Sequence, residues 1–152
     1  MLRLHTSDGC LLGESYELIS EKESFIVAEA AGVPIYAHDG IRSVSFTNSP
    51  YYSHMHLGAI DLYPRKPDGI VLSPVKGRVT GIREVRAPRS LYFEACEEEK
   101  LLLIENNSEY VTKILHLRPT VSVGDLVQIS DPIGEYVRSG FFNFWTGNHI
   151  HV

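Results

Sequence analysis

The stretch LLLIENNSEYVTKILHL, residues 101–117, decides the fold class because it reads as a complete β-hairpin. Residues 101–105 form an apolar run with the length and flanks of a buried strand. Residues 106–108, Asn-Asn-Ser, are typical of a hairpin turn, and residues 109–117 supply the partner strand. We therefore predict an antiparallel hairpin near the middle of the chain.

Short strands of the same kind are predicted on both sides of this hairpin. Gly, Pro, Asn and Asp interrupt the chain at regular intervals after residue 32, without strong helical periodicity. The predicted strands cover residues 33–37, 41–46, 70–82 (strand, turn, strand), 123–127 and 131–137. This pattern predicts a mainly β domain. Residues 94–100, which are rich in glutamate, are expected to form a solvated loop.

Composition narrows the possible functions. The chain has 152 residues, 43% of them hydrophobic and 22% charged, which suits one soluble domain with a real core. A net charge of -5 argues against a nucleic-acid partner. No apolar run approaches transmembrane length, and the first residues lack the pattern of a signal peptide, so the sequence alone favours the cytoplasm. Two cysteines do not make a disulfide framework.

Histidines gather at three places in the sequence. His149 and His151 are two residues apart near the end, so both side chains would project from one face of a strand. Upstream, a second cluster holds His54, His56 and Asp61, and His116 ends the predicted hairpin. Each feature alone is more often structural: surface histidines, a turn-capping aspartate, a satisfied core histidine. Together, one upstream histidine, Asp61 and one C-terminal histidine would supply the three protein ligands of a catalytic zinc site.

The order of these motifs resembles the lysostaphin/LytM-type zinc endopeptidases, which cut peptide cross-links in bacterial cell walls. That family carries H-x-G-x-D, a small-x-P-x-x-G-x-V turn, a strand ending in His-Leu, V-G-D-x-V, an I-G strand and T-G-x-H-L-H. The matching segments here are residues 56–61, 73–79, 116–117, 123–127, 133–134 and 146–151. The resemblance runs from about residue 50 to the end.

The resemblance implies a role for each motif residue. His56, Asp61 and His151 would bind zinc, while His149 and His116 would handle the proton or steady the oxyanion. The implied fold is a curved antiparallel sheet, the duplicated hybrid motif, with the site in an open groove. The implied substrate is a peptide or peptidoglycan, although that family is mostly extracytoplasmic. Residues 1–45 have no counterpart and are expected to form an extension packed on a peptidase-like domain of residues 46–152.

Several departures from the family pattern lead to further expectations. Two residues, Ala59 and Ile60, separate Gly58 from Asp61 where the family has one, so a β-bulge near Gly58 is needed unless His54 substitutes as a ligand. The aromatic segment 141–145 is either core or a groove wall. The sequence also stops at Val152, where the family continues with another strand.

A catalytically degenerate domain of the same fold is the alternative to a metallopeptidase. Residues 73–79 and 123–127 also resemble the halves of biotinyl/lipoyl and sugar-phosphotransferase domains, so a carrier, binding or regulatory module is conceivable. A third reading is a metal-binding protein without hydrolysis. Metal content separates these readings, because stoichiometric zinc supports the peptidase and its absence supports the degenerate module. The oligomeric state is left open by the sequence.

Overall fold

The computed structural model describes residues 23–47, 52–97, 99–107 and 109–152. Their strands are β1 (Ser24–Ala30), β2 (Val33–His38), β3 (Ile41–Ser45), β4 (Asp61–Pro64), β5 (Ile70–Leu72), β6 (Gly77–Glu84), β7 (Lys100–Glu105), β8 (Val111–Pro119), β9 (Leu126–Val127), β10 (Pro132–Tyr136) and β11 (Ile150–His151). One short helix, α1 (Tyr52–Met55), stands among them. The prediction of a mainly β fold with antiparallel sheets is confirmed.

The central hairpin is present as predicted. Strands β7 and β8 pair in antiparallel fashion, with Leu102 opposite Ile114 and Ile104 opposite Thr112. The apolar side chains of Leu102, Ile104 and Ile114 are fully buried, since every second residue of each strand faces the core. The core thus forms around the stretch from which the fold class was inferred.

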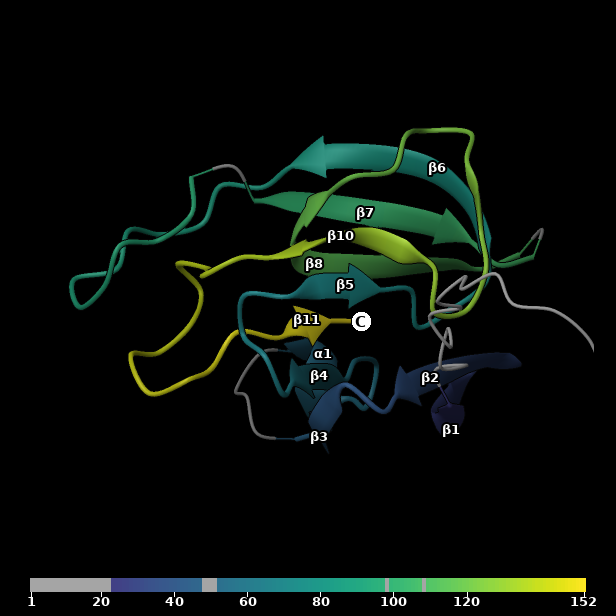
Figure 1. Cartoon of the computed structure of the whole chain (residues 1–152), viewed down its shortest axis with the longest axis horizontal. Coiled ribbons are helices and arrows are strands. Elements are labelled where there is room, and N and C mark those ends of the chain that lie inside the picture. Colours follow the sequence, from purple (N-terminus) through teal and green to yellow (C-terminus); the bar gives the residue numbers. More distant parts are fainter. Residues whose placement is uncertain (1–22, 48–51, 98, 108) are drawn as a thin grey trace, which may run out of the picture.

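The order of strands in the large sheet brings distant segments together. Nine strands form this sheet along the path β3-β4-β11-β8-β7-β6-β9, with β10 pairing β5 and β8 (Figure 1). The two-residue strand β11 lies between β4 and β8. Its His151 pairs with Asp61 on one side and with Leu115 on the other. Residues near the start, middle and end of the domain therefore meet at one point.

Residues 23–45 belong to the same core as the rest of the domain. Strands β1 and β2 form a separate two-stranded sheet, but Ile35 and Ala37 of β2 are buried in the main hydrophobic cluster. Strand β3 pairs with β4, with Ser45 opposite Asp61. The first part of the expected N-terminal extension, residues 1–22, lies outside the described residues.

The bulge expected near Gly58 is replaced by a helix end. Residues 52–55 are helical, and Leu57 has a left-handed backbone with φ of 54°. The amide of Gly58 donates to the Ser53 carbonyl at 2.8 Å and that of Leu57 to the His54 carbonyl at 3.2 Å, the pattern of a Schellman cap. This cap turns the chain sharply so that β4 can begin at Asp61.

A bulge does occur in the sheet, but in β8. Lys100 pairs with Leu117 while Leu102 pairs with Ile114, so β8 carries one more residue than β7 over this span. The backbone of His116 lies there with φ of 69°. An extra residue in a strand bends the backbone and redirects a side chain. The bulge therefore controls where the ring of His116 points.

Two long loops extend from the same end of the sheet, one made of residues 85–97 and 99 before β7 and the other of residues 137–149 before β11 (Figure 1). The amide of Cys96 donates to the carbonyl of Arg138 at 2.8 Å. A Cβ atom on Gly140 would lie 1.8 Å from the Pro88 carbonyl oxygen, so only glycine allows this approach. The two loops consequently pack as a unit.

Candidate metal centre

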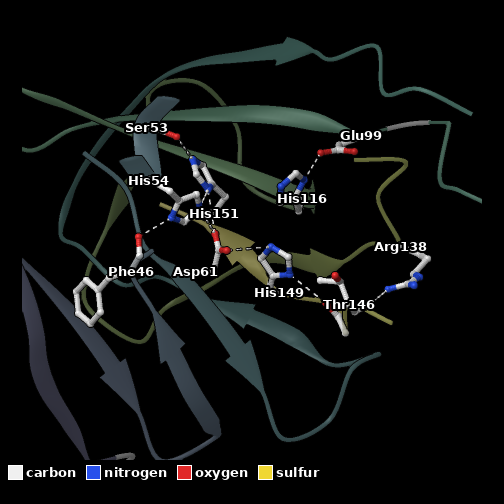
Figure 2. A network of polar contacts seen from close by, with 11 residues as sticks. Phe46, Ser53, His54, Asp61, Glu99, His116, Arg138, Thr146, His149 and His151 are labelled. Carbon is white, nitrogen blue, oxygen red and sulfur yellow. Dashed lines mark hydrogen bonds and ion pairs between the residues drawn. The ribbon is translucent and has the colours of Figure 1, made fainter. Parts of the chain in front are cut away.

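Three side chains from three elements converge at the edge of β11. His54 comes from α1, Asp61 from the first position of β4 and His151 from β11 (Figure 2). The Asp61 Oδ1 atom lies 3.1 Å from His54 Nε2 and 2.9 Å from His151 Nδ1, and the two nitrogens are 3.1 Å apart. His54 and Asp61 are almost completely buried, and His151 is half-buried. The cluster is a compact triangle of two imidazole nitrogens and one carboxylate oxygen.

The outer nitrogen of each imidazole is fixed by a neighbouring oxygen. Nδ1 of His54 donates to the Phe46 carbonyl at 2.9 Å, and because a carbonyl only accepts, this nitrogen carries the hydrogen. Nε2 of His151 lies 3.4 Å from the Ser53 hydroxyl. The His54 ring then directs its unprotonated Nε2 at Asp61, as a metal-binding histidine does when an outer acceptor sets its tautomer. The Ser53 hydroxyl can donate or accept, so it orients the His151 ring without setting its tautomer.

This donor set fits a zinc ion. Zinc takes imidazole nitrogen and carboxylate oxygen at about 2.0–2.2 Å, so the ligand atoms of a tetrahedral site lie about 3.3 Å apart. The three distances of 2.9–3.1 Å are close to this value. In the zinc-free chain the hydrogen bond between His151 and Asp61 places a hydrogen on His151 Nδ1, and a bound cation would take the place of this hydrogen. Three protein ligands leave the fourth tetrahedral position open.

His56 does not join the cluster, and its expected position as a ligand is corrected. Its Nδ1 bonds to the Tyr52 carbonyl at 2.9 Å and its ring stacks on Tyr52 with centroids 3.9 Å apart, at an exposed position. The reason is the turn that continues α1, in which the His56 amide donates to the Tyr52 carbonyl at 3.1 Å, because residues two apart in a helical turn point about 200° apart around the axis. His54 takes the place expected of His56.

The electrostatics of Asp61 favour its charged form. Burial on its own would raise the pKa of this carboxyl, but the hydrogen bond with His151 and the charges of His149, His151 and His54 outweigh burial and leave the pKa below its ordinary value. Asp61 is therefore an ionised ligand at neutral pH. A carboxylate held in this form binds a divalent cation without first losing a proton.

His149 lies beside the cluster with one nitrogen directed at it. Its Nε2 is 3.6 Å from Asp61 Oδ2, and its Nδ1 donates to the Gly147 carbonyl at 2.9 Å. The ring packs against Phe142 at 4.2 Å and Tyr63 at 4.5 Å between centroids. Burial lowers the pKa of His149 to about 4, although Asp61 and the Gly147 hydrogen bond act in the opposite direction. The ring is thus neutral at neutral pH, with a lone pair on the side of the cluster.

His116 approaches from the other side, held by a residue that the sequence did not single out. Its Nδ1 lies 2.5 Å from Glu99 Oε1, and Ser139 donates to Glu99 Oε2 at 2.6 Å. The ring centroid of His116 is 5.3 Å from that of His149 and 6.1 Å from that of His151. Glu99 is 1% exposed, so the expectation of a solvated loop is wrong at this residue.

The aromatic segment 141–145 was expected to form either core or a groove wall, and its residues differ in burial. Phe142 is buried and packs on His149 and His116, as a core residue would. Phe144 and Trp145 are 60% and 70% exposed, and Phe144 lies 5.6 Å from the ring of Tyr92 in the other long loop. Arg138 donates to the carbonyls of Thr146, Asn143 and Phe144 and shapes the loop that leads to His149.

A largely apolar groove of about 690 Å³ reaches the cluster at His151. Its walls come from the β1–β2 hairpin, from the residues after α1 and from the start of β8. Side chains that line it include Ala28, Val33, Ala59, Ile60, Val111 and His151. The candidate centre therefore borders this groove through His151.

The fold and the cluster define a mainly β protein with a candidate metal-binding corner. A family model matches residues 33–152, and the chain belongs to that family, described as "Domain of unknown function (DUF8155) N-terminal domain". No curated protein and no solved structure matches the chain. Within the described residues, no helix has the length and apolar character needed to cross a membrane.

Proposed function

We propose that this chain is a zinc-dependent endopeptidase that hydrolyses peptide bonds, of the kind found in peptidoglycan cross-links. The observation that carries the proposal is the convergence of His54, Asp61 and His151, whose ligand atoms all lie within 4.8 Å of one another. His149 and His116 stand beside this triangle as the resemblance to lysostaphin/LytM-type enzymes implies. The same resemblance supports the duplicated hybrid motif as the finer description of the sheet.

When bound, zinc supplies a Lewis acid that lowers the pKa of a coordinated water to about 7. His54, Asp61 and His151 would hold the ion, with the Phe46 carbonyl and the Ser53 hydroxyl orienting the two rings. The neutral His149, with its hydrogen on Nδ1, presents a lone pair to take a proton from the attacking water. His116 lies on the other side of the centre, and with a hydrogen on Nε2 as well as on Nδ1 it would steady the charge that develops on the scissile carbonyl oxygen.

The groove beside His151 suits an extended peptide. Most of its lining residues are apolar, with Glu29 and Lys113 among the exceptions, so apolar side chains would fit along much of it. Isolated cell walls and short peptides that reproduce their cross-links are therefore the first substrates to test.

Zinc content and hydrolysis test the proposal together. We expect about one zinc ion per purified chain, cleavage of the cross-link peptides, loss of cleavage with a chelator and its return with added zinc. His151→Ala should lose both zinc and cleavage. Full cleavage by His151→Ala, or a chain that takes up no zinc, would overturn the proposal. Tight zinc binding with intact walls and peptides would instead favour a catalytically degenerate binding module.

A further inference from the structure

The carboxylate of Glu99 is buried, and among the described residues it has two hydrogen-bond partners. Its side chain is 0% exposed, Oε1 faces His116 Nδ1 and Oε2 accepts from the Ser139 hydroxyl. Burying an ionised group is costly unless its hydrogen bonds are made inside the protein. An apolar side chain would fill the same space without this cost, so the carboxylate calls for a reason other than packing.

The backbone of His116 carries a second cost at the same place. Its φ of 69° lies in the left-handed region, which side-chain-bearing residues rarely adopt. It belongs to the bulge that breaks the β7–β8 ladder between Lys100 and Leu102. Unusual backbone conformations and buried charges tend to occur together at functional sites, where a side chain must point in one particular direction.

The ring of His116 lies between Glu99 and the candidate metal centre (Figure 2). Nδ1 faces Glu99, and on the opposite side the ring neighbours His149 and His151, with Phe142 packed edge-on at 4.7 Å. Glu99 ends one long loop, and Ser139 begins the other. The two packed loops thus place Glu99 beside the ring of His116 and Ser139 beside Glu99.

We propose that Glu99, supported by Ser139, is the positioning residue for His116. A carboxylate accepts hydrogen bonds and cannot donate one when ionised, so the short Oε1···Nδ1 contact requires the hydrogen on Nδ1. Nε2 is then the nitrogen turned toward the centre. A carboxylate behind a catalytic histidine sets the tautomer and orientation in the same way in serine hydrolases. The catalytic consequence depends on the proposed peptidase function, whereas the placement of the hydrogen does not.

Nuclear magnetic resonance of the zinc-free chain with ¹⁵N-labelled histidine tests the placement directly. In the unmodified chain, the His116 ring should carry its hydrogen on Nδ1, with a strongly downfield-shifted proton signal from the short hydrogen bond. Glu99→Gln should remove that signal or mix the ring's tautomers. Glu97→Gln, which changes an exposed carboxylate of the same loop, should leave it unchanged. A His116 ring in Glu99→Gln with the pattern of the unmodified chain would overturn the proposal.

Kinetics on the zinc-loaded chain test the consequence. We expect kcat in Glu99→Gln to fall about 100-fold with little change in KM or zinc content, since the groove and the metal ligands stay in place. Glu99→Asp should recover part of the rate, and Ser139→Ala should lose less than Glu99→Gln. Unchanged kcat in a folded Glu99→Gln would overturn the positioning role. If the unmodified chain cleaves nothing, the peptidase proposal fails, while the resonance experiment still decides the placement of the hydrogen.

Discussion

The site has two corners, the triangle of His54, Asp61 and His151 and the couple of Glu99 and His116. They differ in whether a cation is needed to complete them. In the triangle of His54, Asp61 and His151, the three ligand atoms lie 2.9–3.1 Å from one another. In the couple of Glu99 and His116, an acceptor faces a donor at 2.5 Å. The triangle can exchange the hydrogen between His151 and Asp61 for a cation, which would then join all three ligand atoms. The couple shares a hydrogen and is already satisfied, so it needs no ligand to hold its shape.

The two corners also differ in how the chain builds them. The triangle depends on strand register, because β11 places His151 directly opposite Asp61. The couple depends on two long loops packed on each other, which bring Glu99 and Ser139 to a bulge in β8. We infer that the sheet creates the place for a metal and that the loops orient the group that works beside it.

The largest expected difference in zinc content and in rate of hydrolysis is the one between His54→Ala and His56→Ala. Removing a buried member of the triangle leaves two ligands, so zinc should be lost and hydrolysis should drop by roughly 10³-fold or more. His56 is exposed and bonds only to its own helix turn, so His56→Ala should retain zinc and rate within about twofold. Bound zinc per chain and the initial rate on a cross-link peptide measure both. The reverse result would restore the sequence-based assignment of His56.

The sequence identified most of the triangle because strand periodicity and motif order are local signals. The approach of His149 and His151 to one site and the presence of Asp61 there followed from such patterns, as did the central hairpin, although β11 begins only at Ile150 and leaves His149 outside the strand. The choice between His54 and His56 did not, because it depends on whether four residues form a helix or a strand. Tertiary contacts decide such short segments.

Glu99 could not be recognised from the sequence for a different physical reason. It is one of four glutamates within residues 94–99, and only the packing of two distant loops buries it while leaving Glu94 and Glu97 exposed. Ser139 carries no motif at all. A signal was nevertheless present, since Glu99 lies two residues before a buried apolar strand and is closer to the core than its neighbours in the acidic run.

Zinc should raise the free energy of unfolding of the chain by binding at the triangle, and this gain should not depend on the couple. A ligand that binds only the folded chain adds about 4 kcal/mol to the free energy of unfolding at 1,000 times its dissociation constant. We expect a gain of this order in the unmodified chain and in Glu99→Gln, measured by thermal or denaturant unfolding with and without zinc. In Asp61→Asn the gain should disappear. Equal gains in Asp61→Asn and the unmodified chain would mean that zinc binds elsewhere.

His149, which lies between the two corners, should make the zinc-free chain sensitive to acid. Its pKa is lowered to about 4 from an ordinary 6.5, so between these values the unfolded chain binds the extra proton and the folded chain does not. The stabilising contribution is complete above pH 6.5 and is lost as the pH falls toward 4, by up to about 3 kcal/mol. Asp61, His116 and His151 face this ring, but the lowered pKa of Asp61 places its own titration below this window.

The measurement is urea unfolding of the chelator-treated chain from pH 7 to pH 4. His149→Phe keeps an aromatic ring against Phe142 and Tyr63 but removes the titrating nitrogen, so its stability should fall less over the same range. Parallel curves for His149→Phe and the unmodified chain would assign the acid sensitivity to other groups.

The smallest effect concerns the two left-handed residues, Leu57 in the cap of α1 and His116 in the bulge of β8. Leu57 is 71% exposed, and glycine fits its φ of 54° without a steric penalty, so Leu57→Gly should stabilise the chain by about 0.5–1 kcal/mol. Leu57→Ala keeps the penalty and serves as the control. His116→Gly relieves the same kind of strain but leaves the buried Glu99 without its partner, so it should destabilise the chain instead. Urea unfolding measures both changes in the free energy of unfolding. A gain for Leu57→Gly with a loss for His116→Gly would show that the contact with Glu99 outweighs the backbone strain at His116. Equal gains for both variants would contradict this.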